Sequence, residues 1–132
     1  MANLILPDSS IYIGALRAGR DPFRSFAAGI DALDWEFATC GQIALEVCRG
    51  LRDPQVLRRF RERFEVMIFL PTTGQVWERA TQLAWGLDHQ GWTLPAPDLL
   101  IAAHALQADA TVLTLDAHFH QIPGLRVINR LE

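Results

Sequence analysis

Short apolar segments alternate with longer helix-like segments along most of this chain. The apolar segments have the length and composition of buried strands, and they cover residues 4–6, 35–39, 66–70, 111–115 and 125–128. The helix-like segments cover residues 11–17, 21–33, 42–50, 54–64, 73–87 and 97–106. Strands separated by helices form βαβ units with parallel strands. We therefore expect an α/β fold, with a mainly parallel central sheet flanked by helices.

The length and composition predict a single globular domain over residues 1–132. Hydrophobic residues make up 50% and charged residues 20% of the chain, which suits one packed core and excludes a disordered class. No apolar run reaches the length of a membrane span, and the N-terminus lacks the pattern of a signal peptide. We expect the protein to be cytoplasmic and not to associate with a membrane. Cys40 and Cys48 show no CxxC spacing and are expected to be buried packing residues.

The formal net charge of −3 argues weakly against a nucleic-acid partner, but the charge is unevenly distributed. All 12 basic residues are arginines, and six of them fall between Arg49 and Arg63. The absence of lysine excludes receiver domains and haloacid-dehalogenase-type phosphatases, which rely on a lysine near the phosphoryl group. The absence of a G-K-[ST] motif excludes a P-loop nucleotide-binding protein.

Two aspartates directly follow predicted strands. Asp8 comes after the strand at 4–6, and Asp116 comes after the strand at 111–115. The carboxyl ends of parallel strands meet at one edge of the sheet, where active sites of α/β proteins form. We expect both carboxylates at that edge.

Two further acids are candidates for the same site, although each acid also has a purely structural explanation. Asp98 could complement a helix dipole, Asp8 could cap a helix, and Asp116 could belong to a turn. Glu46 lies within an apolar run and could pair with Arg49 one turn along. A carboxylate among apolar side chains needs compensation, which a divalent cation would provide. If the four carboxylates form one metal site, all of its protein ligands are oxygen atoms. Such ligands favour Mg²⁺ or Mn²⁺ over zinc.

Four motifs carry these acids in order, and a fifth segment continues the last motif. They read LPDSSI at 6–11, ALEVCRGL at 44–51, PDLLIAAHA at 97–105, VLTLDAHF at 112–119 and IPGLRV at 122–127. The motifs resemble the PIN domain, and in particular its small VapC-type toxin members, over nearly the whole chain. The resemblance implies that Asp8, Glu46, Asp98 and Asp116 are the catalytic, metal-binding acids. It also implies that Ser10 and Thr114 support these acids through hydrogen bonds.

The function implied by the resemblance is that of an Mg²⁺-dependent endoribonuclease, with Mn²⁺ as a substitute. Such a protein acts as the toxin of a toxin–antitoxin pair, with RNA as its substrate, a cognate antitoxin as its partner and a homodimer as its assembly. Two alternatives remain open at this point. One is a PIN nuclease with a housekeeping role in RNA processing, and the other is a catalytically silent PIN-fold binding module.

A few further residues are weighed against plainer roles. Many relatives carry an acid where this chain has His118, for which a surface position is favoured over contact with metal or substrate. Arg49, Arg58, Arg59 and His118 are candidate RNA contacts, although arginines in such a run usually form a solvated helix face. His104 is expected in the core. The four tryptophans are expected to pack in the core or in a dimer rather than to stack on bases.

Overall fold

The computed structural model describes residues 3–130. Its elements alternate between strand and helix for most of the chain, as the sequence pattern predicts. In order they are β1 (Asn3–Pro7), α1 (Ser9–Arg17), α2 (Pro22–Leu33), β2 (Trp35–Cys40), α3 (Gly41–Arg49), α4 (Pro54–Val66), β3 (Ile68–Leu70), α5 (Gly74–His89), α6 (Ala96–Ala108), β4 (Thr111–Leu113), the 3₁₀ helix η1 (Ala117–Gln121) and β5 (Val127–Ile128).

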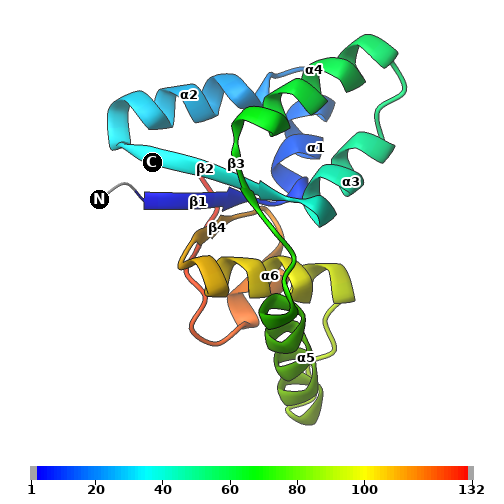
Figure 1. Ribbon diagram of the computed structural model, residues 1–132, viewed down its shortest axis with the longest axis vertical. Helices are drawn as coiled ribbons and strands as arrows, with labels where there is room; N and C mark the ends of the chain where they lie inside the picture. The colour runs from blue at the N-terminus through cyan, green and yellow to red at the C-terminus, as the bar shows by residue number, and fades with distance from the viewer. Residues whose placement is uncertain (1–2, 131–132) are drawn as a thin grey trace.

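The strands form a parallel sheet in the order β3-β2-β1-β4-β5. Helices α1 to α4 lie on one side of strands β1 and β2, and α5 and α6 lie on the other side (Figure 1). The α/β class is therefore confirmed, and every strand pairing between residues 3 and 130 is parallel. The chain adds β2 and β3 on one side of β1 and then β4 and β5 on the other. The strand order thus switches between β1 and β4.

β1 is the central strand, and its sequence suits burial on both faces. Ile5 and Leu6 are fully buried and contribute to the main core. Pro7 ends the strand, where it has no N–H to donate. The β1–β2 pairing ends at Ile5, and on the other side the N–H of Asp8 continues the β1–β4 ladder by donating to Leu113 O at 2.9 Å. The proline therefore lies where the missing donor leaves the β4 ladder intact.

An aromatic cluster packs helices α1, α2 and α4 against one another on one side of the sheet. Tyr12 of α1 is fully buried and packs edge-on against Phe26 and Phe64, from α2 and α4. Phe23 and Phe60 extend the cluster, with ring centroids 5.1 Å apart. On the other side of the sheet α6 is apolar on almost all of its surface, and its segment 99–105 is buried. The site described below lies at the ends of these firmly packed elements.

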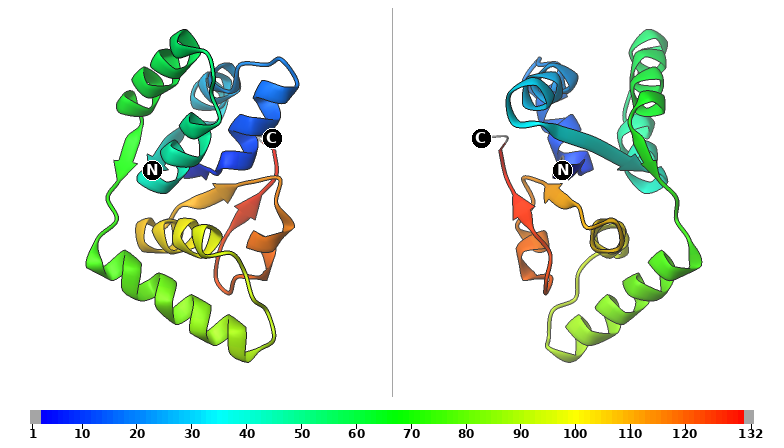
Figure 2. Two further views of the ribbon diagram at one scale, coloured as in Figure 1. Left: turned by 90° about the vertical axis from the view of Figure 1, so that its right-hand side faces the viewer. Right: turned by 60° about the vertical axis from the view of Figure 1, so that its left-hand side comes forward.

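The structure corrects three details of the sequence interpretation. Val66 is the last residue of α4 and is exposed, so the predicted strand at 66–70 begins only at Ile68. The strand predicted at 111–115 ends at Leu113, because the backbone turns away to place Thr114 under the site. Core packing holds only for Trp35, which packs partly buried against the core, whereas Trp77, Trp85 and Trp92 are exposed, and their packing in a dimer stays a prediction. The two on α5 are exposed because that helix packs mainly on α6, at the end of the molecule opposite α4 (Figure 2).

Other expectations about individual residues are met. His104 is buried on α6, where its Nε2 lies 2.9 Å from Thr72 Oγ1. Cys40 is buried, Cys48 is half-buried against the core, and both are free thiols. Within residues 3–130, no helix is long and apolar enough to cross a membrane.

Candidate metal centre

The candidate site lies at the carboxyl ends of β1 and β4, where the strand order switches. Asp8 follows β1 directly, and Asp116 follows β4 after a two-residue turn. Asp98 projects from the first turn of α6, and Glu46 lies on α3. Helices α3 and α6 contact each other across this edge. The fold therefore brings to one edge of the sheet four acids that are widely separated in sequence.

Two hydroxyl groups hold the carboxylate of Asp8. The backbone N–H of Leu115 donates to Ser10 Oγ at 3.0 Å. The backbone N–H of Asp116 donates to Thr114 Oγ1 at 2.9 Å. Since each hydroxyl accepts from the backbone, its single hydrogen is free for Asp8. Ser10 Oγ donates to Oδ1 at 2.5 Å, and Thr114 Oγ1 donates to Oδ2 at 2.8 Å. The backbone after β4 therefore determines the orientation of this carboxylate.

Asp8 keeps a free acceptor position on Oδ2. Oδ1 accepts two hydrogen bonds from Ser10, through its N–H and its hydroxyl, whereas Oδ2 accepts one from Thr114. A carboxylate oxygen offers about two lone-pair sites. Asp8 is only 3% exposed, and burial raises its pKa more than these hydrogen bonds lower it. The charge of Asp98 raises the pKa slightly further.

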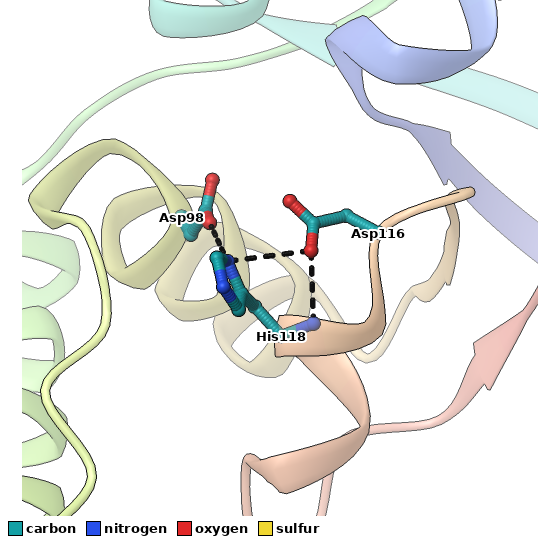
Figure 3. A group of neighbouring side chains, drawn as sticks. All are labelled: Asp98, Asp116 and His118. Atoms are coloured by element: carbon teal, nitrogen blue, oxygen red, sulfur yellow. Dashed lines mark hydrogen bonds and ion pairs between the residues drawn. The ribbon is translucent and has the colours of Figure 1, made fainter.

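A triangle of possible ligand atoms lies beside Asp8. His118 Nδ1 is 3.1 Å from Asp98 Oδ2 and 3.3 Å from Asp116 Oδ1. The imidazole ring stands between the two carboxylates (Figure 3). These three side chains form a group whose ligand atoms all lie within 4.8 Å of one another. Asp8 and Glu46 are outside that group, so the structure brings the four predicted acids together only in part.

Glu46 contributes an unusual buried oxygen. Its Oε1 is inaccessible to solvent and has no hydrogen-bond partner among the described residues. The ion pair with Arg49 considered above is absent from the ion pairs found within residues 3–130. Burial raises the pKa of Glu46, the side chain of Gln42 opposes this effect, and the charge of Asp98 makes a smaller contribution that raises the pKa. A buried carboxylate oxygen without a partner is unfavourable unless something else compensates it.

Electrostatic repulsion links all four acids through Asp98. Burial raises the pKa of Asp98, and the charge of Asp116 adds to this effect, while His118 opposes it. Asp98 in turn raises the pKa of Asp8 and of Glu46. A divalent cation would relieve this repulsion and would pair with the buried oxygen of Glu46. Carboxylate oxygens with one imidazole nitrogen therefore form a donor set that fits a divalent metal ion.

Two of the acids also have the structural roles that were considered from the sequence. Asp8 caps α1 by accepting from the N–H of Ser10, and Asp116 caps η1 by accepting from the N–H of His118. The side chain of His118 is 45% exposed, in line with the favoured surface position, and its ring also contacts two of the acids. The sequence feature that pointed to this contact was a histidine at a position where many relatives carry an acid.

The candidate RNA-contacting arginines lie apart from this hydrogen-bond network. Arg58 and Arg59 are exposed on α4, and Arg49 is exposed at the end of α3. Within residues 3–130, the salt bridges found join none of these three to a site carboxylate. Their role in binding RNA stays a prediction.

Fold and site together define a parallel α/β protein with a candidate divalent-metal centre at the carboxyl edge of its sheet. The family model of the PIN domain matches residues 5–125, and the chain belongs to the PIN domain family.

Solved structures with the same fold come from toxin–antitoxin complexes and toxins. VapBC-1 from nontypeable Haemophilus influenzae is 20% identical, with a TM-score of 0.78 over 95% of this chain and 96% of that chain. DNA-bound VapBC from Salmonella typhimurium is 20% identical, with a TM-score of 0.78 over 97% and 98%. VapC20 from Mycobacterium tuberculosis, a sarcin-ricin loop cleaving toxin, is 14% identical, with a TM-score of 0.64 over 92% and 98%. A comparison with curated proteins gives no match. At these identities the likeness establishes the fold.

Proposed function

We propose that this protein is a metal-dependent endoribonuclease that hydrolyses RNA phosphodiester bonds at the site formed by Asp8, Glu46, Asp98 and Asp116. The observation that carries the proposal is the solvent-inaccessible Oε1 of Glu46, which has no hydrogen-bond partner among the described residues and belongs to a group of acids that all repel Asp98. Membership of the PIN family supports it. A silent binding module would have no need for this unfavourable charge cluster.

The proposed chemistry divides the work between the ion and the side chains. Asp8, Glu46, Asp98 and Asp116 would hold a divalent ion, Mg²⁺ or Mn²⁺, which when bound would activate a water and neutralise charge at the scissile phosphate. Asp8 offers its free Oδ2 position to the ion, while Ser10 and Thr114 hold the carboxylate in one orientation. Asp98, Asp116 and Glu46 would provide the remaining negatively charged oxygen donors around the ion. The proposed contribution of the protein is therefore a rigid, preorganised set of oxygen donors.

RNA cleavage with a chelator and a matched pair of variants tests this proposal. Activity should disappear in EDTA and return with Mg²⁺ or Mn²⁺, because the acids cannot neutralise the phosphate by themselves. Glu46→Gln keeps the size of the side chain and removes its charge, so cleavage should fall by more than about tenfold. Glu62→Gln makes the same chemical change on the exposed surface of α4 and should leave activity unchanged. Cleavage that persists after thorough chelation would overturn the proposal.

We further propose that the nuclease is the cytoplasmic toxin of a toxin–antitoxin pair and that it forms a homodimer. The structures from Haemophilus influenzae and Salmonella typhimurium are toxin–antitoxin complexes, which supports a protein antitoxin as the partner. The negative site suits an arginine from that partner, because a guanidinium can pair with two carboxylates at once. The housekeeping nuclease is the alternative role.

Co-expression with the product of the adjacent gene separates the two roles. A toxin should arrest growth when induced alone, and the neighbouring product should co-purify with it and relieve the arrest. Light scattering of the purified chain at micromolar concentration should show a dimer. If the neighbouring product neither binds nor relieves arrest while RNA cleavage persists, the housekeeping role replaces the toxin role.

A further inference from the structure

We propose that His118 is a ligand of the divalent ion and that it biases this site toward Mn²⁺ over Mg²⁺. This inference rests on the metal dependence proposed above. It concerns a residue at which the chain departs from the acidic residue of many relatives. The argument uses the geometry of the ring, its anchoring in the fold and the chemistry of a nitrogen donor.

Two distances within the Asp98–Asp116–His118 triangle, both from His118 Nδ1, are close to those between neighbouring positions around an octahedral ion. Adjacent ligands of an ion with bonds of about 2.1 Å stand about 3.0 Å apart. His118 Nδ1 lies 3.1 Å from Asp98 Oδ2 and 3.3 Å from Asp116 Oδ1. Figure 3 shows the carboxylates approaching the same edge of the ring from different elements. The three ligand atoms lie within 4.8 Å of one another, so they are close enough to be drawn onto one ion.

Hydrogen bonding alone explains this arrangement incompletely. Nδ1 carries at most one hydrogen, yet it faces two carboxylate oxygens at similar distances. One of those oxygens, Asp116 Oδ1, already accepts from the backbone N–H of His118 at 2.9 Å. In the tautomer with the hydrogen on Nε2, Nδ1 has no hydrogen to donate and presents a lone pair close to both carboxylate oxygens. A cation between these three atoms would satisfy them together.

The fold anchors His118 but leaves its ring accessible. The next residue, Phe119, is fully buried in the main core and fixes the start of η1. The N–H of His118 is bonded to Asp116, which ties its backbone to the turn after β4. The side chain is 45% exposed, so the ring can adjust without disturbing the core. The neighbouring His120 is exposed on the same helix and has no hydrogen bond among the described residues, which makes it a matched control.

A nitrogen ligand changes which ion is preferred. Mg²⁺ favours oxygen ligands and retains its waters, whereas imidazole is a better ligand for first-row transition ions. Replacing a carboxylate by His118 also removes one negative charge from the site, which weakens a mainly electrostatic Mg²⁺ site most. The chain should therefore bind Mn²⁺ more tightly relative to Mg²⁺ than a variant with the carboxylate restored.

Pulsed electron paramagnetic resonance of Mn²⁺ bound to the full chain tests the ligand directly. The wild-type protein should show modulation from a coordinated ¹⁴N nucleus. The modulation should be lost in His118→Ala and kept in His120→Ala. Bound Mn²⁺ without ¹⁴N coupling, or coupling that is lost in His120→Ala instead, would overturn the role of His118 and leave the metal centre standing. A protein that binds no Mn²⁺ would overturn the metal centre itself.

Calorimetric titration with Mn²⁺ and with Mg²⁺ tests the preference. The ratio of the Mg²⁺ Kd to the Mn²⁺ Kd should fall by about tenfold in His118→Asp, on the scale by which metal-site substitutions change affinity. It should stay unchanged in His120→Asp, which adds the same charge nearby. Circular dichroism confirms that each variant is folded before titration. An equal ratio in the wild type and His118→Asp would overturn the proposed bias.

Discussion

The two halves of the acidic site are built in different ways. The closed half consists of Asp8, Ser10 and Thr114, in which Asp8 is 3% and Thr114 is 1% exposed. The open half is the Asp98–Asp116–His118 triangle, whose side chains are between 17% and 45% exposed. The closed half is held by hydrogen bonds from both hydroxyls and from the backbone. In the open half, the side chains face one another across short distances with few other partners.

This difference indicates which part of the site can vary. In the closed half, backbone N–H groups fix the direction of both hydroxyls, so a different side chain would leave buried groups unsatisfied. In the open half, a ring or a carboxylate of similar reach can be accommodated with solvent on one side. A histidine therefore stands at position 118, in the open half. Substitutions in the two halves should differ accordingly.

The largest expected effect is that of Asp8→Asn in the closed half. The amide removes the charge and replaces one ligand oxygen by a donor nitrogen, so RNA cleavage should fall by more than about a hundredfold. Cleavage of a labelled RNA at saturating Mn²⁺ is the measurement. Asp88→Asn, on the exposed surface of α5, is the matched control and should behave as wild type. Full activity of Asp8→Asn would contradict the importance assigned to this half.

A smaller effect is expected for Thr114→Val, which keeps the shape and removes the hydroxyl. The N–H of Asp116 loses its acceptor and Asp8 Oδ2 loses its donor. The free energy of unfolding should fall by about 1–3 kcal/mol, the cost of unsatisfied buried polar groups. Activity should fall by about 10- to 100-fold. Urea unfolding and RNA cleavage measure the two effects.

Thr114→Ser is the control for that substitution, because it keeps the hydroxyl and removes only a methyl group. It should restore most of the activity lost in Thr114→Val. If Thr114→Val remains as active as wild type, the hydrogen bond from the Thr114 hydroxyl does not position Asp8 for catalysis.

The sequence predicted the fold class and the positions of Asp8 and Asp116 after strands well, because both depend on local patterns. The alternation of strands and helices follows from apolar spacing, and the positions of Asp8 and Asp116 follow from the ends of apolar segments. The burial of His104 followed from its apolar neighbours on α6.

Features that depend on neighbouring elements were less predictable. The last turn of α4 continues through Val66, although a β-branched apolar residue there suggested a strand. The exposure of Trp77 and Trp85 reflects the packing of α5 on α6, which the sequence of α5 does not record. The contact of the His118 ring with Asp98 depends on how η1 meets α6, so the sequence predicted the exposed position of His118 but not this contact. The hydrogen bonds from Ser10 and Thr114 to Asp8 were implied by the resemblance only. Their direction depends on backbone N–H groups of a turn that is distant in sequence from Asp8.

The smallest effect, and one of opposite sign, is expected for Asp98→Asn in the metal-free protein. Burial and, to a lesser degree, the charge of Asp116 raise the pKa of Asp98 above its ordinary value of 3.8, against the opposing effect of His118. An acid with a higher pKa in the folded state binds its proton more tightly there, so ionisation lowers the free energy of unfolding. This loss of stability is absent at pH values below the pKa that Asp98 has in the unfolded chain. It develops as the pH rises through the higher pKa that Asp98 has in the folded state.

In EDTA at pH 7, Asp98→Asn should therefore melt at a higher temperature than the wild type. The difference should narrow as the pH is lowered, because the wild-type carboxyl of Asp98 then becomes protonated. Mn²⁺ should reverse the order, because it stabilises only a folded protein that can bind it. Thermal melts between pH 4 and pH 8, with and without Mn²⁺, measure this, and Asp88→Asn again serves as the control. A lower melting temperature for metal-free Asp98→Asn at pH 7 would mean that its bond to His118 outweighs the repulsion, and that the open half is held together without an ion.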